Sequence, residues 1–221
     1  MKVKRRIKHS FILSLILLSA PAIGFTQPNI IEEASYLSSL EKAVIREMNM
    51  ARTSPGGYLS LLEEFKENYD GKLLKLPEGK LILTKEGTEA VVEAIRSLRS
   101  QKPVLLLRPS KGMSLGARDH AKDLGSSGRY GHQGSDSSQP WDRVNRYGIW
   151  EKTIGENISF GSDQARIVVI SFIVDDGDAD RGHRKNIFNP DFHVVGVACR
   201  HPAAYGTICV ITFAGGYQEK N

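Results

Sequence analysis

Gly182-His183-Arg184-Lys185-Asn186-Ile187 is the longest of three short segments in which glycine accompanies a side chain able to bind metal or transfer protons. The other two are Gly131-His132-Gln133-Gly134 and Gly155-Glu156-Asn157-Ile158. Glycine lets the backbone turn sharply, so such segments can bring distant side chains together. Two imidazoles and one carboxylate are the minimum parts of an open zinc site or of an acid–base pair. We therefore predict that the two histidines and the glutamate of these segments converge on one pocket.

An acidic run, Asp175-Asp176-Gly177-Asp178-Ala179-Asp180, precedes the last segment. Its second, fourth and sixth residues match the first three ligand positions of an EF-hand calcium loop. Arg181 stands where that loop needs glycine, and Ile187 stands at the closing glutamate position. These departures argue against an EF-hand. They leave a solvated acidic turn with one carboxylate facing the histidines, or another calcium site with oxygen ligands.

A nucleophile-elbow pattern, G-x-S-x-G, also occurs, at Gly112-Met113-Ser114-Leu115-Gly116. Asp175 and His183 would complete the order Ser…Asp…His. The elbow requires its serine at the end of a strand, but residues 108–111 separate Ser114 from the preceding apolar run. Too little β-structure precedes the motif for an α/β-hydrolase sheet. We expect Ser114 in the first turn of a helix and keep serine hydrolysis as a minor alternative.

The chain begins with a segment typical of a secretory leader. Cations between Lys2 and Lys8 precede an apolar run from Phe11 to Ala20, and small residues follow up to Gly24. The run is too short to span a bilayer comfortably, and no cysteine near it would carry a lipid anchor. We predict export to the periplasm or the cell exterior. The predicted organisation is a signal peptide over 1–24, a linker over 25–33, one domain over 34–217 and a tail over 218–221.

The net positive charge of the chain comes from this leader. The whole sequence has 30 Lys+Arg against 25 Asp+Glu, and the leader contains five of the cations and no acid. The remaining chain is therefore neutral and gives no support for a nucleic-acid partner. No second apolar stretch approaches the length of a transmembrane helix, so we predict no stable membrane span after leader removal.

Cys199 and Cys209 are the only cysteines, and each lies in a β-like run. The runs cover 194–199 and 208–213, with Pro202 in the turn-rich stretch between them. Antiparallel pairing would bring the sulfurs together, and an exported chain meets oxidising conditions. We predict a disulfide, with two buried free thiols as the alternative.

Hydrophobic periodicity predicts helices before the terminal hairpin, which favours an α+β class over alternating βαβ units. The predicted helices cover 34–51, 58–65, a segment from Thr88, a segment from Ser110, 141–147 and 165–174. The last is apolar almost all round, and its β-branched residues leave a strand as an alternative. His120 lies on or beside the inner face of the helix from Ser110. A packed structural histidine is the favoured role there, and a place in the cavity is the alternative.

The order of these segments resembles the CAP superfamily, also called the SCP domain, in its exported bacterial form. The resemblance rests on Asn49–Pro55, Ala117–Ala121, Trp141-Asp142-Arg143, Gly155–Ile158, Gly182–Pro190 with Phe192, Val195-Gly196-Val197 and Phe213-Ala214. It implies an α–β–α sandwich with a small central antiparallel sheet and a central cavity. Residues 66–105 are longer than the family norm.

The resemblance also implies a cavity that gathers two histidines and two acidic residues. Carried over, these are His132, His183, Glu156 and a second acid, which is Asp175 or Asp176. We expect His132 and His183 to bind a divalent metal ion. Two neutral imidazoles suit zinc better than calcium or magnesium. Glu156 would support a ligand or act as a base.

Two other functions stay open because the domain alone does not choose among activities. One is a sterol- or fatty-acid-binding module in which the cavity is structural. The other is hydrolysis, through metal-activated water or through Ser114. The sequence leaves open whether the protein is an enzyme.

Overall fold

The computed structural model describes residues 30–76, 79–202 and 206–220. The signal peptide predicted for 1–24 and the first part of the linker predicted for 25–33 lie outside the described residues. Within the described ranges, every helix is too short or too polar to cross a bilayer.

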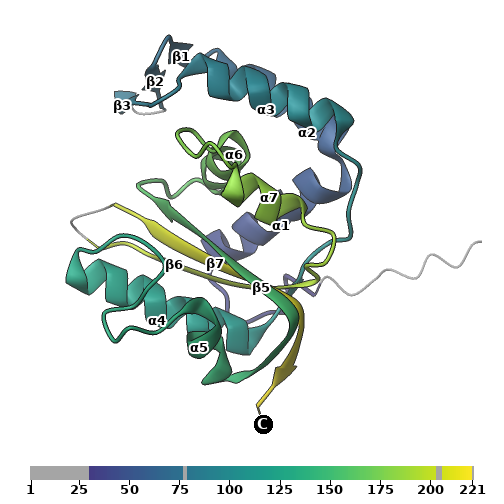
Figure 1. The fold of residues 1–221 in the computed structure, drawn as a ribbon, viewed down its shortest axis with the longest axis vertical. Coiled ribbons are helices and arrows are strands. Elements are labelled where there is room, and N and C mark those ends of the chain that lie inside the picture. The colour runs from purple at the N-terminus through teal and green to yellow at the C-terminus, as the bar shows by residue number, and fades with distance from the viewer. Residues whose placement is uncertain (1–29, 77–78, 203–205, 221) are drawn as a thin grey trace, which may run out of the picture.

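A four-stranded sheet forms the middle of the structure, with strand order β4-β6-β7-β5 (Figure 1). Its strands are β4 (Arg108–Pro109), β5 (Gly148–Phe160), β6 (Val194–Arg200) and β7 (Ile208–Glu219). The pairs β6–β7 and β7–β5 are antiparallel, and the short β4 adds in parallel to β6. Strand β5 is thus an edge strand. The glycine-containing segment Gly155–Ile158 lies within it.

Helices cover both faces of this sheet, which confirms the predicted α–β–α sandwich (Figure 1). One face carries α4 (Lys111–Ser127) and α5 (Pro140–Asn145); the other carries α1 (Ser39–Thr53), α6 (Ala165–Val174) and α7 (Gly182–Phe188). Side chains alternate along each strand, so Val210 packs against the α4 face whereas Ile211 and Phe213 pack into the larger core on the other. Gly196 lets α4 lie directly on β6, because a Cβ there would lie 2.2 Å from the carbonyl carbon of Met113.

The helix ends follow local capping chemistry. Ser38 begins α1 with a capping box to Glu41, and the Ser110 hydroxyl caps α4 at its first turn. The helix predicted from Thr88 does begin at that residue, and Gly87 is its N-cap. Residues 165–174 are helical, so the strand alternative was wrong.

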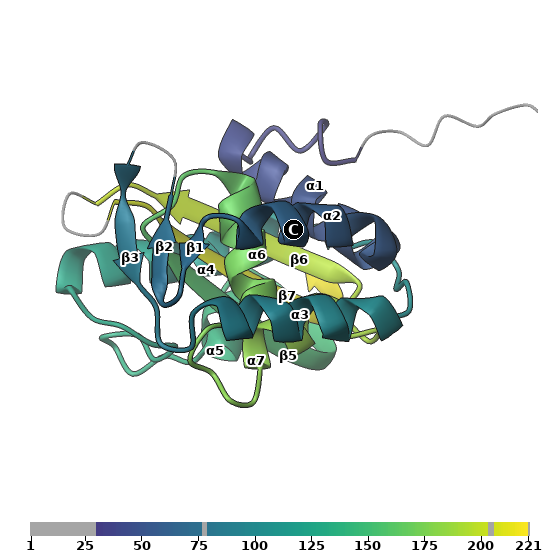
Figure 2. The same cartoon turned by 90° about the horizontal axis from the view of Figure 1, so that it is seen from above.

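The segment 66–105, expected to be longer than the family norm, contributes an additional layer outside α6 (Figure 1 and Figure 2). Helix α2 (Pro55–Lys66) enters it, and α3 (Thr88–Ser100) packs alongside α2. Between them lies a small antiparallel sheet of β1 (Tyr69–Asp70), β2 (Leu73–Lys75) and β3 (Leu81–Leu83). The three strands are too short to show an alternating pattern in the sequence.

Arg52, at the end of α1, joins the two halves of the chain. Its side chain is buried, and its guanidinium donates to the carbonyl oxygens of Leu105 (2.8 Å), Ile187 (2.5 Å) and Phe192 (2.9 Å). A buried cation needs such partners because desolvation is costly. Arg52, within the Asn49–Pro55 segment that resembles the family, therefore has a structural role.

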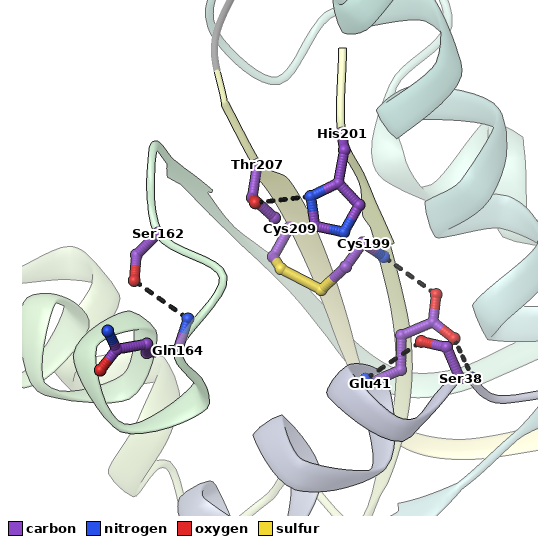
Figure 3. The surroundings of a disulfide bond; sticks show 8 residues. All are labelled: Ser38, Glu41, Ser162, Gln164, Cys199, His201, Thr207 and Cys209. Atoms are coloured by element: carbon purple, nitrogen blue, oxygen red, sulfur yellow. Dashed lines mark hydrogen bonds between the residues drawn. A yellow bond between two sulfur atoms is a disulfide. The ribbon is translucent and has the colours of Figure 1, made fainter. Parts of the chain in front are cut away.

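The predicted disulfide between Cys199 and Cys209 is confirmed (Figure 3). The two cysteines are directly opposite each other in β6 and β7. The amide of Cys199 donates to Glu41 Oε1 at 2.9 Å, which fixes the start of α1 to the same strand (Figure 3).

Candidate functional site

Glu156 occupies the centre of the site on the edge strand β5. It lies on the face covered by α4 and α5, and only 1% of its side chain is exposed. Arg143 of α5 donates from one guanidinium nitrogen to both carboxylate oxygens, at 3.1 and 2.8 Å. Because both partners are buried, the pair compensates a charge that would otherwise be costly to desolvate.

His132 is fixed against this carboxylate by the loop that follows α4. Its Nδ1 lies 3.0 Å from Glu156 Oε1. The other terminal nitrogen of Arg143 donates to the His132 carbonyl at 3.1 Å and to the Ser138 carbonyl at 2.9 Å. One buried arginine thus positions both the carboxylate and the loop that carries the histidine.

His183 forms a second histidine–carboxylate pair on the other side of β5. Its Nδ1 lies 2.6 Å from Asp175 Oδ1, and its backbone amide donates to Asp175 Oδ2 at 2.8 Å. Asp175 has a left-handed backbone conformation at the C-terminus of α6, which turns its carboxylate toward the start of α7. The hydrogen bond that His183 donates to Asp175 raises the pKa of His183, although partial burial opposes this shift. The ring also stacks on Phe172, with centroids 5.5 Å apart.

Both histidines and Glu156 line one pocket of about 330 Å³ at the edge of β5, whereas Asp175 supports His183 from outside its lining. His132, Glu156 and His183 all contribute to its wall, as do Asp178, Gly182, Lys185 and Asn186. His132 comes from the helical layer of α4 and α5, whereas His183 comes from the layer of α6 and α7. Gly155 leaves room for the Phe192 ring against the strand, since a Cβ there would lie 2.9 Å from Phe192 Cζ.

Both imidazoles present the same nitrogen for binding. A carboxylate only accepts hydrogen bonds, so each Nδ1 must carry the proton it donates. In the neutral ring, Nε2 then holds the free lone pair. Neither Nε2 has a hydrogen-bond partner among the described residues, and the rings are 48% and 32% exposed for His132 and His183. Each imidazole therefore presents Nε2 as a possible metal ligand. Among the described residues, however, the group of ligand atoms that lie close together includes His183 and not His132.

Asp178 also lies at the site, although the sequence indicates it only as a member of the acidic run. Asp175, Asp178 and His183 each offer a ligand atom, and these atoms lie within 4.8 Å of one another. Asp178 is half-buried in the pocket wall, where it accepts the amides of Gly182 at 3.2 Å and Asp180 at 3.0 Å. Asp178 follows a turn in which Asp175 and Gly177 have positive φ values. Such a turn has no helix or strand periodicity, so the sequence does not show which way this side chain points.

Asp176, the other candidate for the second acid, contacts the outer layer; its described hydrogen bonds do not include His183. Its carboxylate accepts the backbone amides of Lys85, Glu86 and Gly87 at 2.6, 2.7 and 3.0 Å. Asp175, its neighbour, makes the contact with His183. Asp176 instead connects the acidic loop to the outer layer.

His120 and Ser114 both have structural contacts. His120 is fully buried, with Nε2 2.9 Å from the Gly131 carbonyl and 3.9 Å from Glu156 Oε1, and its burial lowers its pKa. Ser114 is also fully buried; its hydroxyl donates to Ser110 and accepts from the Val197 amide. Because Ser114 lies inside α4, the nucleophile-elbow alternative was wrong.

Comparison with known proteins supports the resemblance to the CAP family. Residues 92–213 match the cysteine-rich secretory protein family, CAP. YkwD of Bacillus subtilis (strain 168) is 33% identical over 107 residues, which are 48% of this chain and 40% of that protein. The chain thus spans less than half the length of this relative.

Two solved structures are similar at low identity. An extracellular protein containing an SCP domain from Bacillus anthracis has a TM-score of 0.41 and 18% identity, over 57% of this chain and 37% of that one. An outer surface protein from Borrelia burgdorferi has a TM-score of 0.44 and 17% identity, over 60% and 89%. The family match covers more than half of the sequence and includes His132, Glu156 and His183, so this chain belongs to the CAP family of cysteine-rich secretory proteins.

Proposed function

We propose that this protein is an exported CAP-domain protein that binds one divalent metal ion, zinc, through Nε2 of His132 and Nε2 of His183. The observation that carries the proposal is that two imidazoles line one pocket and that each Nδ1 is paired with a buried carboxylate. Such carboxylates fix the tautomer and the orientation of a ligating imidazole and increase its basicity. Two neutral imidazoles favour zinc over calcium or magnesium.

Asp178 is the proposed third ligand. It lines the same pocket and keeps more solvent exposure than Asp175, which is committed to His183. Two histidines and a carboxylate are a common ligand set of open zinc sites. A bound zinc ion acts as a Lewis acid and lowers the pKa of water.

Glu156 acts in this proposal as a positioning residue and not as a general base. Its Oε1 contacts both His132 and Arg143, and its Oε2 contacts Arg143 and, at 3.5 Å, the Thr212 hydroxyl. A base needs an oxygen that is free to accept a substrate proton. Because both oxygens of Glu156 already have partners, these contacts favour metal binding over hydrolysis as the function of the site.

Export is part of the same proposal. The cationic and apolar start of the sequence is typical of a leader, and disulfides persist mainly in oxidising compartments. The periplasm and the cell exterior both meet this condition.

Zinc titration of the metal-free protein tests the proposal. We expect one zinc ion per chain in the wild type and loss of this binding in His132→Ala/His183→Ala, because both imidazole ligands are removed. The matched control is His193→Ala/His201→Ala, which also removes two imidazoles but leaves the pocket intact. Asp175→Asn and Glu156→Gln should each weaken zinc binding by about 10–100-fold. Equal zinc affinity in the wild type and in His132→Ala/His183→Ala would refute the proposal.

The lipid-binding alternative makes the opposite prediction. In a sterol- or fatty-acid-binding module with a structural cavity, saturable lipid binding survives the loss of both histidines. Measuring both ligands on the same two variants separates the functions.

A further inference from the structure

The small sheet β1–β2–β3 presents leucines on the face that points away from the core. The sheet lies at the end of the molecule opposite α4 and α5 (Figure 1). In β3, Ile82 packs against the main core, whereas Leu81 and Leu83 are 59% and 79% exposed. Successive side chains of a strand point to opposite faces, so these two leucines share the outer face. Neither leucine belongs to a core cluster of the described residues.

The neighbouring strand extends this outer face. Leu73 of β2 is paired with Leu83, and Lys75 is paired with Leu81. Leu74, between Leu73 and Lys75 in the sequence, is buried on the inner side. Directly paired residues lie on the same side of a sheet. The outer side of the small sheet therefore carries a leucine face, made of Leu73, Leu81 and Leu83, with Lys75 at its border.

Lysines flank the leucine face in the sequence and across the sheet. All four are exposed, and they are Lys72, Lys75, Lys80 and Lys85. Among the described residues of 69–85 the only acid is Asp70, which lies 3.7 Å from the Lys75 ammonium. Of the acids that contact the end of this segment, Glu86 is paired with Arg181 and Asp176 accepts backbone amides. The leucine face is thus surrounded by a local excess of positive charge.

This excess of charge decides which partner fits. Strand β3 is an edge of the small sheet, so a second copy could in principle pair with it. Such pairing would bring the lysines of the two copies together, and like charges across strands are destabilising. An anionic lipid bilayer has no such conflict, because its head groups attract lysines and its interfacial region accepts leucines.

We propose that the leucine face is a docking surface for an anionic lipid bilayer. Leu81 and Leu83 enter the boundary between head groups and acyl chains, and the flanking lysines contact lipid phosphates. The contact is reversible, since even a single myristoyl chain gives only reversible membrane binding. The inference concerns the outer layer alone and does not depend on the proposed metal binding.

Co-sedimentation with lipid vesicles tests the docking surface. The protein is used as recovered after export, because the apolar start of the unprocessed chain would bind lipid by itself. We expect binding to vesicles of equal parts phosphatidylglycerol and phosphatidylcholine, and binding weaker by about tenfold or more to pure phosphatidylcholine. Added salt should weaken the first binding, because it screens the lysine charges.

Two double substitutions of exposed leucines provide the matched comparison. Leu81→Ser/Leu83→Ser should weaken binding to the anionic vesicles by about tenfold or more, because two apolar side chains leave the interface. Leu105→Ser/Leu106→Ser is the control. It also removes two leucines, 68% and 43% exposed, but they precede β4 and lie outside the small sheet, so binding should equal that of the wild type.

The lysines are tested in the same way. Lys72→Gln/Lys80→Gln should weaken binding by about fivefold for each lysine. Lys102→Gln/Lys122→Gln, which removes two exposed lysines elsewhere, should leave it unchanged.

An added tryptophan reports which face meets the bilayer. Phosphatidylglycerol with brominated acyl chains should quench the fluorescence of Leu83→Trp more strongly than that of Leu105→Trp.

Several results would overturn the proposal. It is wrong if the wild type binds neither kind of vesicle at low salt, or binds both equally. It is also wrong if the two leucine pairs have the same effect, or if Leu83→Trp and Leu105→Trp are quenched alike. A dimer that forms without lipid and is lost in Leu81→Ser/Leu83→Ser, with no vesicle binding by the wild type, would assign the leucine face to a second copy instead.

Discussion

At the scale of single residues, burial and hydrogen bonding shift the pKa values of two histidines in opposite directions. Burial lowers the pKa of His120, and the hydrogen bond to Asp175 raises that of His183. The ordinary value of 6.5 in the unfolded chain separates the two effects. As the pH falls below 6.5, His120 becomes protonated in the unfolded chain but stays neutral in the folded protein. The unfolded state therefore binds more protons, and His120 lowers the free energy of unfolding as the pH falls. His183 contributes stability below 6.5, and the contribution is lost as the pH rises through its raised pKa in the folded protein.

Substitution of each histidine should therefore change the pH dependence on a different side of 6.5. His120→Gln should flatten the loss of stability on the acidic side, and His183→Gln should remove the loss on the basic side. The free energy of unfolding in urea, measured with EDTA from pH 5 to pH 8, gives both profiles. Parallel curves for the wild type and the two variants would contradict the assignment.

At the scale of elements, the loop between α6 and α7 is held in shape by the outer layer. Asp175 and Arg181 both have positive φ values, 54° and 52°, which cost about 1–2 kcal/mol for a residue with a Cβ. Arg181 forms a bidentate pair with Glu86 at 2.6 and 2.7 Å and lowers the pKa of that carboxyl to about 2. With the Asp176 contacts to the amides of residues 85–87, this pair offsets the backbone strain that turns Asp175 toward His183.

Asp176→Ala should remove the hydrogen bonds between the α6–α7 loop and the amides of residues 85–87. We expect a loss of about 1–3 kcal/mol in the free energy of unfolding, because three amides lose a charged acceptor near the surface. Faster hydrogen exchange at Lys85, Glu86 and Gly87 should accompany it. Asp180→Ala, in the same loop, is the control and should stay within about 0.5 kcal/mol of the wild type. Similar exchange rates at these amides in the two variants would show that Asp176 does not hold the outer layer.

Local patterns explain which elements and site residues the sequence predicts. The helices from Ser110 and over 165–174 have strong apolar signals, and the β6–β7 hairpin is apparent from its two β-runs and their cysteines. The outer sheet was missed because its strands have two or three residues each. The glycine-containing segments indicated His132, Glu156 and His183. Arg143 as the partner of Glu156, and the separate contacts of Asp175 and Asp176, depend on packing between distant segments that periodicity does not encode.

At the scale of the whole molecule, the site lies where the two helical layers meet around the edge strand β5. An ion bound by both histidines would connect these layers directly. A ligand that binds only the folded state stabilises it by about 2.7 kcal/mol at one hundred times its Kd. Zinc at that concentration should therefore raise the melting temperature of the wild type, and it should leave that of His132→Ala/His183→Ala unchanged. Calorimetric scans with and without zinc check both results, and an equal rise in the two proteins would mean that zinc binds elsewhere.

Arg52 imposes an order on how the chain can fold. The carbonyls of Ile187 and Phe192 that accept from it follow it by 135 and 140 residues. While the polypeptide is still being made, α1 lacks two of the carbonyl acceptors of this buried cation. We therefore expect the N-terminal half to reach its final packing only after residue 192 has emerged. A chain interrupted before residue 187 would keep the Leu105 acceptor but lack those of Ile187 and Phe192, and it is expected to be a target for proteases.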